Sequence, residues 1–175
     1  MQNGLDPRPS FDRAIAGLQK AAQINPGYAI SYGNLSGVLK NRADYETQIG
    51  IDSQSSLDKA ISGYWKAIHL NSEYAIAYGN LAEAYQAKAA QQLEAGADPR
   101  ETILRGMQAA QKALSIDREF NEPHVALARL HILDARRAIN TKGVPIPDLD
   151  WARKESQKSL LIKVCCKTRA SCRYL

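Results

Sequence analysis

The chain repeats itself at a spacing of 46 residues, and this repeat constrains the fold more than any other feature. Glycine recurs at Gly4, Gly50 and Gly96, and an aspartate follows two residues after each. Apolar and aromatic positions keep the same register: Phe11, Leu57 and Ile103; Ala21, Ala67 and Ala113; Tyr28, Tyr74 and Phe120; Leu35, Leu81 and Leu127. Self-similarity at this period predicts a repeat protein whose units bury one another's apolar faces.

Within each copy the apolar residues have helical spacing. Leu57, Ile61, Tyr64 and Ile68 step by four, three and four residues, which lines one face of a helix with about 3.6 residues per turn. Turn residues then separate a short helix from a long one. We predict an all-α fold, an antiparallel helix-hairpin solenoid of about seven helices, at 10–24, 27–47, 56–70, 73–95, 101–116, 119–141 and 148–163.

The corners between copies carry helix stop and start signals. Gly96 is suited to the left-handed conformation that ends a helix. Asp98 and Pro99 then favour a new helix start, and Glu101 is placed to reach back as in a capping box. The middle copy lacks the proline, and there we predict that Ser56 caps the helix.

We divide the sequence into a repeat domain, residues 1–163, and a basic tail, residues 164–175. The units lie near 4–47, 50–95 and 96–141, with a partial unit at 142–163. The net charge is +5, and four of these charges are Lys163, Lys167, Arg169 and Arg173, which leaves +5 − 4 = +1 for the rest. The three cysteines, Cys165, Cys166 and Cys172, lie in the same tail, and we favour free thiols over a metal site there.

The repeat resembles the tetratricopeptide repeat. The residues that match the first helix of that family are Tyr78, Leu81, Ala82 and Tyr85; those that match the second are Ala60, Tyr64 and Ala67; Pro26 matches its closing proline. The family's unit has about 34 residues, so each copy here is longer by about twelve. The resemblance implies a right-handed superhelix that acts as a protein-protein interaction scaffold and binds a peptide or protein segment on its concave face.

The long unit is also similar to the repeats that follow the catalytic domain of certain bacterial serine/threonine protein kinases. This resemblance implies an alternative, in which the chain is the C-terminal regulatory or docking fragment of such a kinase. The sequence itself has no glycine-rich loop, no His-Arg-Asp and no Asp-Phe-Gly. Because the repeat also breaks off after Lys163, we expect a fragment or an altered C-terminus.

No set of residues converges on a catalytic, cofactor or metal site, so we predict a chain that is not an enzyme and holds no cofactor. His124 and His131 share a helix face, but they stand at the positions of Tyr78 and Tyr85, where packing is expected. Tyrosines at helical spacing are predicted to be core or seam residues. Trp65 is predicted to pack between units, and Trp151 to be partly exposed.

Asn34 and Asn80 are the candidate binding residues. The resemblance places them on the concave face, and an amide can donate to and accept from a peptide backbone. Residues predicted to share this surface are Ile30, Ile76, Glu83, Gln86, Arg129 and Ile132, whereas the third position of the asparagine row is Ala126. Gly33 and Gly79 are predicted to leave room there for a ligand.

Partners and location follow from what the sequence lacks. It has no apolar run of the ~20 residues that a membrane helix needs and no signal-peptide pattern, so we predict a cytoplasmic protein without a membrane segment. We expect protein or peptide partners and no nucleic acid. End-to-end self-association of the repeat array is a second hypothesis, because apolar faces at the ends of a solenoid need a cover.

Overall fold

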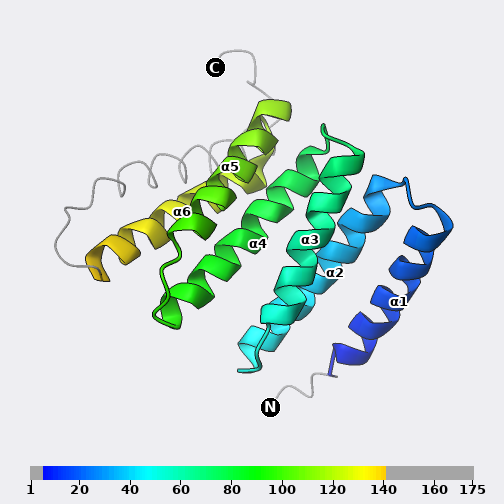
Figure 1. Cartoon of the computed structure of the whole chain (residues 1–175), viewed down its shortest axis with the longest axis horizontal. Coiled ribbons are helices and arrows are strands. Elements are labelled where there is room, and N and C mark those ends of the chain that lie inside the picture. The colour runs from blue at the N-terminus through cyan, green and yellow to red at the C-terminus, as the bar shows by residue number, and fades with distance from the viewer. Residues whose placement is uncertain (1–5, 141–175) are drawn as a thin grey trace, which may run out of the picture. The chain divides into compact units, whose positions relative to one another are not determined.

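The computed structural model describes residues 6–140, and within them every regular element is an α-helix. The helices are α1 (Arg8–Ile24), α2 (Ala29–Gln48), α3 (Gln54–Leu70), α4 (Ala75–Glu94), α5 (Arg100–Ile116) and α6 (Asn121–Asn140) (Figure 1). The all-α prediction is confirmed, and six predicted helices are present with both ends within two residues of the expected positions. The predicted seventh helix at 148–163, Trp151 and the tail lie outside the described residues.

The chain forms two compact units, which divide after Ala77. The first contains α1, α2, α3 and the first residues of α4, and α2 packs against both α1 and α3. Its core is built on small and aromatic residues. Leu57, Ala60, Tyr64 and Ala67 of α3 are buried, as is Tyr32 of α2.

Small residues bring α2 and α3 close together. A Cβ added at Gly63 of α3 would collide with the hydroxyl of Ser36 on α2. The Ser36 hydroxyl in turn donates to the carbonyl of Tyr32, 2.8 Å away, so this buried polar group is satisfied. Close backbone approach at these positions explains why the repeat has glycine and serine where a larger core residue would be expected.

The second unit contains the rest of α4 with α5 and α6. Its core joins Ala89 of α4, Ile103 of α5, and Leu130 and Leu133 of α6, with Ala90, Leu93 and Met107 packed around them. A Cβ at Gly106 would lie 2.9 Å from a methyl carbon of Leu130 and 3.1 Å from the Cβ of Tyr85. Here, too, a helical glycine admits the side chain of a neighbouring helix.

The corners between copies follow one design. Gly50 and Gly96 end their helices with φ of +74° and +75°, which confirms the left-handed conformation predicted for Gly96. The carboxylate of an aspartate then accepts a hydrogen bond from the first amide of the next helix. These bonds join Arg8 N to Asp6 Oδ1 (3.0 Å), Gln54 N to Asp52 Oδ1 (2.9 Å) and Arg100 N to Asp98 Oδ1 (3.0 Å).

Two expectations about these caps are wrong. Ser56 does not start α3, because the helix already begins at Gln54 and Ser56 is buried inside its first turn. Asp52 supplies the cap without a proline. Glu101 does not reach back to the cap: its carboxylate accepts from Arg105 Nε one turn later, at 2.9 Å.

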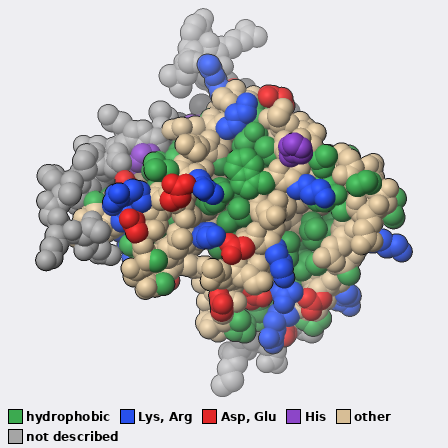
Figure 2. Space-filling view, viewed as in Figure 1, with side chains coloured by type: hydrophobic (Ala, Val, Ile, Leu, Met, Phe, Trp, Pro, Cys, Tyr) green, Lys and Arg blue, Asp and Glu red, His purple; other side chains and the backbone are tan. Residues whose placement is uncertain are grey.

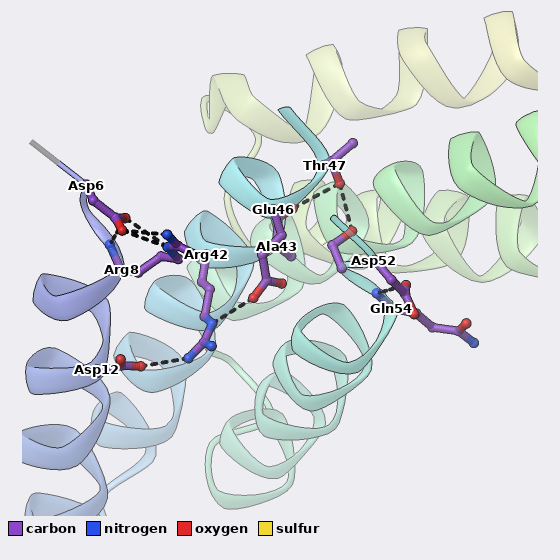
Figure 3. A network of polar contacts seen from close by, with 10 residues as sticks. Asp6, Arg8, Asp12, Arg42, Ala43, Glu46, Thr47, Asp52 and Gln54 are labelled. Carbon is purple, nitrogen blue, oxygen red and sulfur yellow. Dashed lines mark hydrogen bonds and ion pairs between the residues drawn. The ribbon is translucent and has the colours of Figure 1, made fainter. Parts of the chain in front are cut away.

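Polar contacts tie α1 to α2 in the first unit (Figure 3). Arg42 of α2 donates from one terminal nitrogen to Asp12 of α1 and from Nε to Glu46, each at 2.8 Å. Glu46 is buried, and its second oxygen, Oε2, has no hydrogen-bond partner. At the corner beyond it, the hydroxyls of Thr47 and Ser53 lie 2.7 Å apart and join the end of α2 to the start of α3.

Candidate functional site

The candidate binding residues of the first unit lie on one face of α2 and at the start of α4. Ile30 and Asn34 are one turn apart on α2, so their side chains leave the helix on the same side. Ile30 is 40% exposed, Ile76 is 53% exposed and Asn34 is also exposed. An exposed isoleucine therefore accompanies an exposed amide on this surface.

In the second unit the candidates lie on α4 and α6. Asn80, Glu83 and Gln86 follow one another at steps of three residues along α4, and all three are partly exposed. Arg129 and Ile132, three residues apart on α6, are both exposed. Ala126 is buried at the third asparagine position, so α6 offers no surface there. Which of these residues contact a partner stays a prediction.

Neither Asn34 nor Asn80 uses its amide within the described part of the chain. Other polar side chains of α2 and α4, among them Thr47 and Glu83, have partners, whereas the side-chain amides of Asn34 and Asn80 make no hydrogen bond with residues 6–140. An asparagine inside a helix costs about 0.5 kcal/mol relative to alanine. Within residues 6–140, no side-chain hydrogen bond therefore offsets this cost at either asparagine.

The glycines beside the asparagines do not leave room for a ligand, contrary to our expectation. A Cβ added at Gly33 would lie 3.1 Å from Cε1 and 3.2 Å from the hydroxyl oxygen of Tyr74. At Gly79 the added atom would meet Phe120 at 2.7 Å and Pro123 at 3.3 Å. Each glycine thus receives the aromatic side chain that precedes the next long helix, and Gly33 and Gly79 are buried.

Two aromatic predictions need correction as well. Trp65 is exposed rather than packed between units. Tyr28 is 49% exposed, whereas Tyr32, Tyr64 and Tyr85 are buried as predicted. Tyr32 also has a partner that sequence reasoning missed: Lys66 Nζ lies 4.3 Å from the centroid of its ring, within the range of a cation–π interaction. The signal was present, because lysine recurs at positions 20, 66 and 112.

The shifted pKa values of the described residues have structural causes. Hydrogen bonds from Arg8 lower the pKa of Asp6, and hydrogen bonds to Glu46 and Glu101 raise those of Arg42 and Arg105. Burial is the main cause that raises the pKa of Tyr74, and the nearby Tyr28 adds to it. None of these is a pair of groups set up for proton transfer.

The described residues also offer no cluster of metal-ligating side chains. Within residues 6–140 no three His, Cys, Asp or Glu side chains come together at distances suited to an ion. His124 and His131 are partly buried on α6. No helix in this part of the chain combines the length and the apolar character that a bilayer requires. On the face seen in Figure 2, positive and negative side chains are interspersed with exposed hydrophobic ones.

The chain was compared with protein families, curated proteins and solved structures. No protein-family model and no curated protein matches the chain. A crystal structure of MamA protein is 19% identical over 96% of this chain and 90% of that chain, with a TM-score of 0.44. A second crystal structure of MamA is 20% identical over 94% and 96% of the two chains, with a TM-score of 0.42.

Proposed function

We propose that this chain is a protein-interaction scaffold, and that its long helices α2 and α4 bind an extended peptide or protein segment. The observation that carries the proposal is a recurring pair. Exposed Ile30 lies one turn before Asn34 on α2, and exposed Ile76 lies one turn before Asn80 on α4. The two pairs are 46 residues apart, so the repeat presents the same chemistry twice.

Each pair suits one stretch of extended polypeptide. The amide of asparagine can donate to a backbone carbonyl and accept from a backbone N–H, and it does so without regard to the ligand's side chains. The neighbouring isoleucine gains about 25 cal/mol for each Å² of apolar surface that the ligand covers. Each pair thus offers backbone contacts for affinity and an apolar contact for selectivity.

The test starts from peptides selected on the wild-type chain from a random library displayed on phage. The affinity of a selected, fluorescein-labelled peptide is then measured by fluorescence anisotropy for wild type and for the double variant Asn34→Ala/Asn80→Ala. We expect binding to weaken by roughly tenfold or more, since two pairs of backbone hydrogen bonds are lost. The thermal midpoint should stay equal or rise, because alanine is the better helix former.

A matched control changes two exposed amides away from these pairs. Gln19 on α1 and Gln111 on α5 are exposed, so Gln19→Ala/Gln111→Ala removes the same number of amides. This variant should bind like wild type. Unchanged affinity of the Asn34→Ala/Asn80→Ala variant, or an equal loss in both variants, would refute the proposed site.

A further inference from the structure

The pairing of an apolar residue with an amide, on which the proposed function rests, continues along α2 to its last residue. Exposed or partly exposed apolar side chains alternate with exposed amides at steps of three or four residues, in the order Ile30, Asn34, Val38, Asn41, Tyr45 and Gln48. Residues at these steps share one face of a helix. The first unit therefore carries three apolar-amide pairs in one line along α2, which we call the amide row.

The three amides of the amide row have hydrogen-bonding capacity to offer to a ligand. Asn34, Asn41 and Gln48 are exposed, and their side-chain amides make no hydrogen bond with residues 6–140. Each amide can donate two hydrogen bonds and accept others. The row thus repeats, along one helix, the chemistry of the Ile30 and Asn34 pair.

Charge does not select the ligand of the amide row. The two cations of α2 each pair with an anion one turn later on the same helix, Lys40 with Asp44 and Arg42 with Glu46. A strongly acidic or basic ligand would find no net charge on α2 to attract it. Amides beside apolar surface suit a neutral ligand that has both hydrogen-bonding groups and apolar groups.

The ligand must have free backbone groups to use three amides in a line. The N–H and C=O groups within an α-helix are bonded to each other. A docked helix would therefore cover the amides without giving them backbone partners, which costs free energy. An extended chain, by contrast, keeps backbone groups available on the side that faces α2.

The spacing of the amides indicates which extended conformation fits. Successive amides are seven residues apart, which is about 10.5 Å along the helix, and three residues of extended chain cover about 9–10 Å. After three residues a β-strand presents its backbone groups on the opposite side. A polyproline II helix has three residues per turn and presents them on the same side again. The longer side chain of Gln48 leans further toward the start of α2, which shortens the last step.

Helix α4 has the first pair of this row and lacks the other two. The positions that correspond to the second and third pairs hold Ala84, Ala87, Gln91 and Glu94. Ala84 is fully buried, so it offers no apolar surface there. The long site is thus a property of the first unit.

We propose that the amide row binds a proline-rich segment of a partner polypeptide in the polyproline II conformation, which lies along α2 and spans about seven residues. This rests on the proposed function and adds Asn41, Gln48 and the class of ligand to it. The amides donate to the carbonyl group of every third ligand residue, and the proline rings cover the apolar residues between the amides. Proline suits this contact because it fixes the extended conformation before binding and keeps its carbonyl acceptor.

The probe is a fluorescein-labelled peptide of nine prolines, and fluorescence anisotropy measures its binding to the full chain. We expect saturable binding at one peptide per chain. Asn41→Ala/Gln48→Ala should weaken binding by roughly tenfold or more, because two of the three donors are lost. This variant should fold at least as well as wild type, since both residues are exposed and alanine is the better helix former.

Two controls accompany this measurement. Gln19→Ala/Gln111→Ala removes the same number of exposed amides from α1 and α5 and should bind nine prolines like wild type. A labelled peptide of alternating glycine and serine is flexible, so at equal length it should bind wild type roughly tenfold more weakly than nine prolines. No saturable binding at about 1 mM nine-proline peptide, equal affinities of the two double variants, or equal affinities of the two peptides overturns the proposal.

Failure of this proposal is distinguishable from failure of the proposed function. A phage-selected peptide that binds Asn34→Ala/Asn80→Ala weakly, together with nine prolines that bind Asn41→Ala/Gln48→Ala like wild type, would leave the scaffold function standing and refute the amide row. A selected peptide that binds Asn34→Ala/Asn80→Ala unchanged would refute both.

A segment of the same chain is the other candidate occupant. Residues 143–148 contain Pro145 and Pro147 and lie outside the described residues. Pro145→Ala/Pro147→Ala should leave the affinity for nine prolines unchanged. Tighter binding of nine prolines to this variant would show that the chain's own prolines compete for α2, and it would overturn the proposal of a partner polypeptide.

Discussion

The ring of Tyr74 occupies the space beside Gly33, 3.1 Å from the point where a β-carbon would stand. The same relationship recurs in the second unit, where Phe120 occupies the space beside Gly79. In each unit, one glycine of a long helix receives the aromatic residue that precedes the next long helix. This contact fixes how the two segments align. Glycine weakens a helix, but the packing requires it here because a β-carbon would take the space of the ring.

We expect alanine at Gly79 to destabilise the protein. The added methyl would lie 2.7 Å from Phe120 and 3.3 Å from Pro123, so the ring must move, and overpacking of this kind costs about 1–3 kcal/mol. The better helix propensity of alanine offsets up to about 1 kcal/mol of this loss. The net loss in the free energy of unfolding should be about 1 kcal/mol, measured by urea denaturation.

Gly37 is the control for that substitution. It lies on α2, and its nearest contact to an added Cβ is the Tyr64 hydroxyl at 3.8 Å, which is ordinary van der Waals distance. Gly37→Ala should therefore stabilise the protein by about 0.5–1 kcal/mol through propensity alone. If Gly79→Ala were stabilising to the same degree, the aromatic rings would not be the reason for the glycines.

A second prediction concerns the start of α3. Asp52→Ala removes the acceptor of the Gln54 amide and should lower the free energy of unfolding by about 1 kcal/mol. Ser56→Ala should be nearly neutral, because Ser56 is a buried residue within the helix rather than its cap. Thermal denaturation of the two variants decides between the two caps. A larger loss for Ser56→Ala would restore the capping role that the sequence suggested.

The sequence predicts the helices well because two independent local signals agree. Apolar spacing defines where each helix runs, and residues such as Gly96 and Asp98 define where one ends and the next begins. Both signals depend on neighbours within a few residues. The wrong prediction that Ser56 caps α3 also comes from reading local signals alone. Asp52 and Ser56 are both good capping residues, and only the backbone geometry distinguishes them.

The candidate site is less accessible to sequence reasoning because it depends on residues far apart in the chain. Gly33 and Gly79 looked open from their own helices, and the aromatic rings that fill them come from 41 residues later. Trp65 was predicted to pack between units, yet its side chain is exposed on α3. The kinase alternative and the peptide contacts of Asn34 and Asn80 depend on partners or segments beyond the described residues and stay predictions.

A third prediction concerns Arg42, which links Asp12 of α1 to the buried Glu46 (Figure 3). Arg42→Met leaves the Glu46 carboxylate buried without its cation, and one of its oxygens already has no partner. Removing one member of such a pair is more harmful than removing both. Because the Arg42 side chain is about one-third exposed, solvent limits the expected loss to about 1–2 kcal/mol.

A double-mutant cycle tests this account. Adding Glu46→Leu to Arg42→Met removes the unpaired charge and should recover at least half of the lost stability in urea denaturation. Asp12→Ala alone should cost less than about 0.5 kcal/mol, because Asp12 is well exposed and its ion pair is screened. A double variant that is less stable than Arg42→Met would show that Glu46 contributes through other contacts.

The last prediction uses the hydroxyl of Tyr74. Its pKa is raised above 10.0, mainly by burial. A raised pKa in the folded state means that folding favours the neutral phenol, so its contribution to stability is complete below pH 10.0 and is lost as the pH rises through the folded pKa. The difference in unfolding free energy between wild type and Tyr74→Phe should therefore change in that alkaline range alone. The absorbance of tyrosinate, compared between the two proteins, gives the pKa directly. A Tyr74 titration at or below pH 10.0 would contradict the burial of its hydroxyl group.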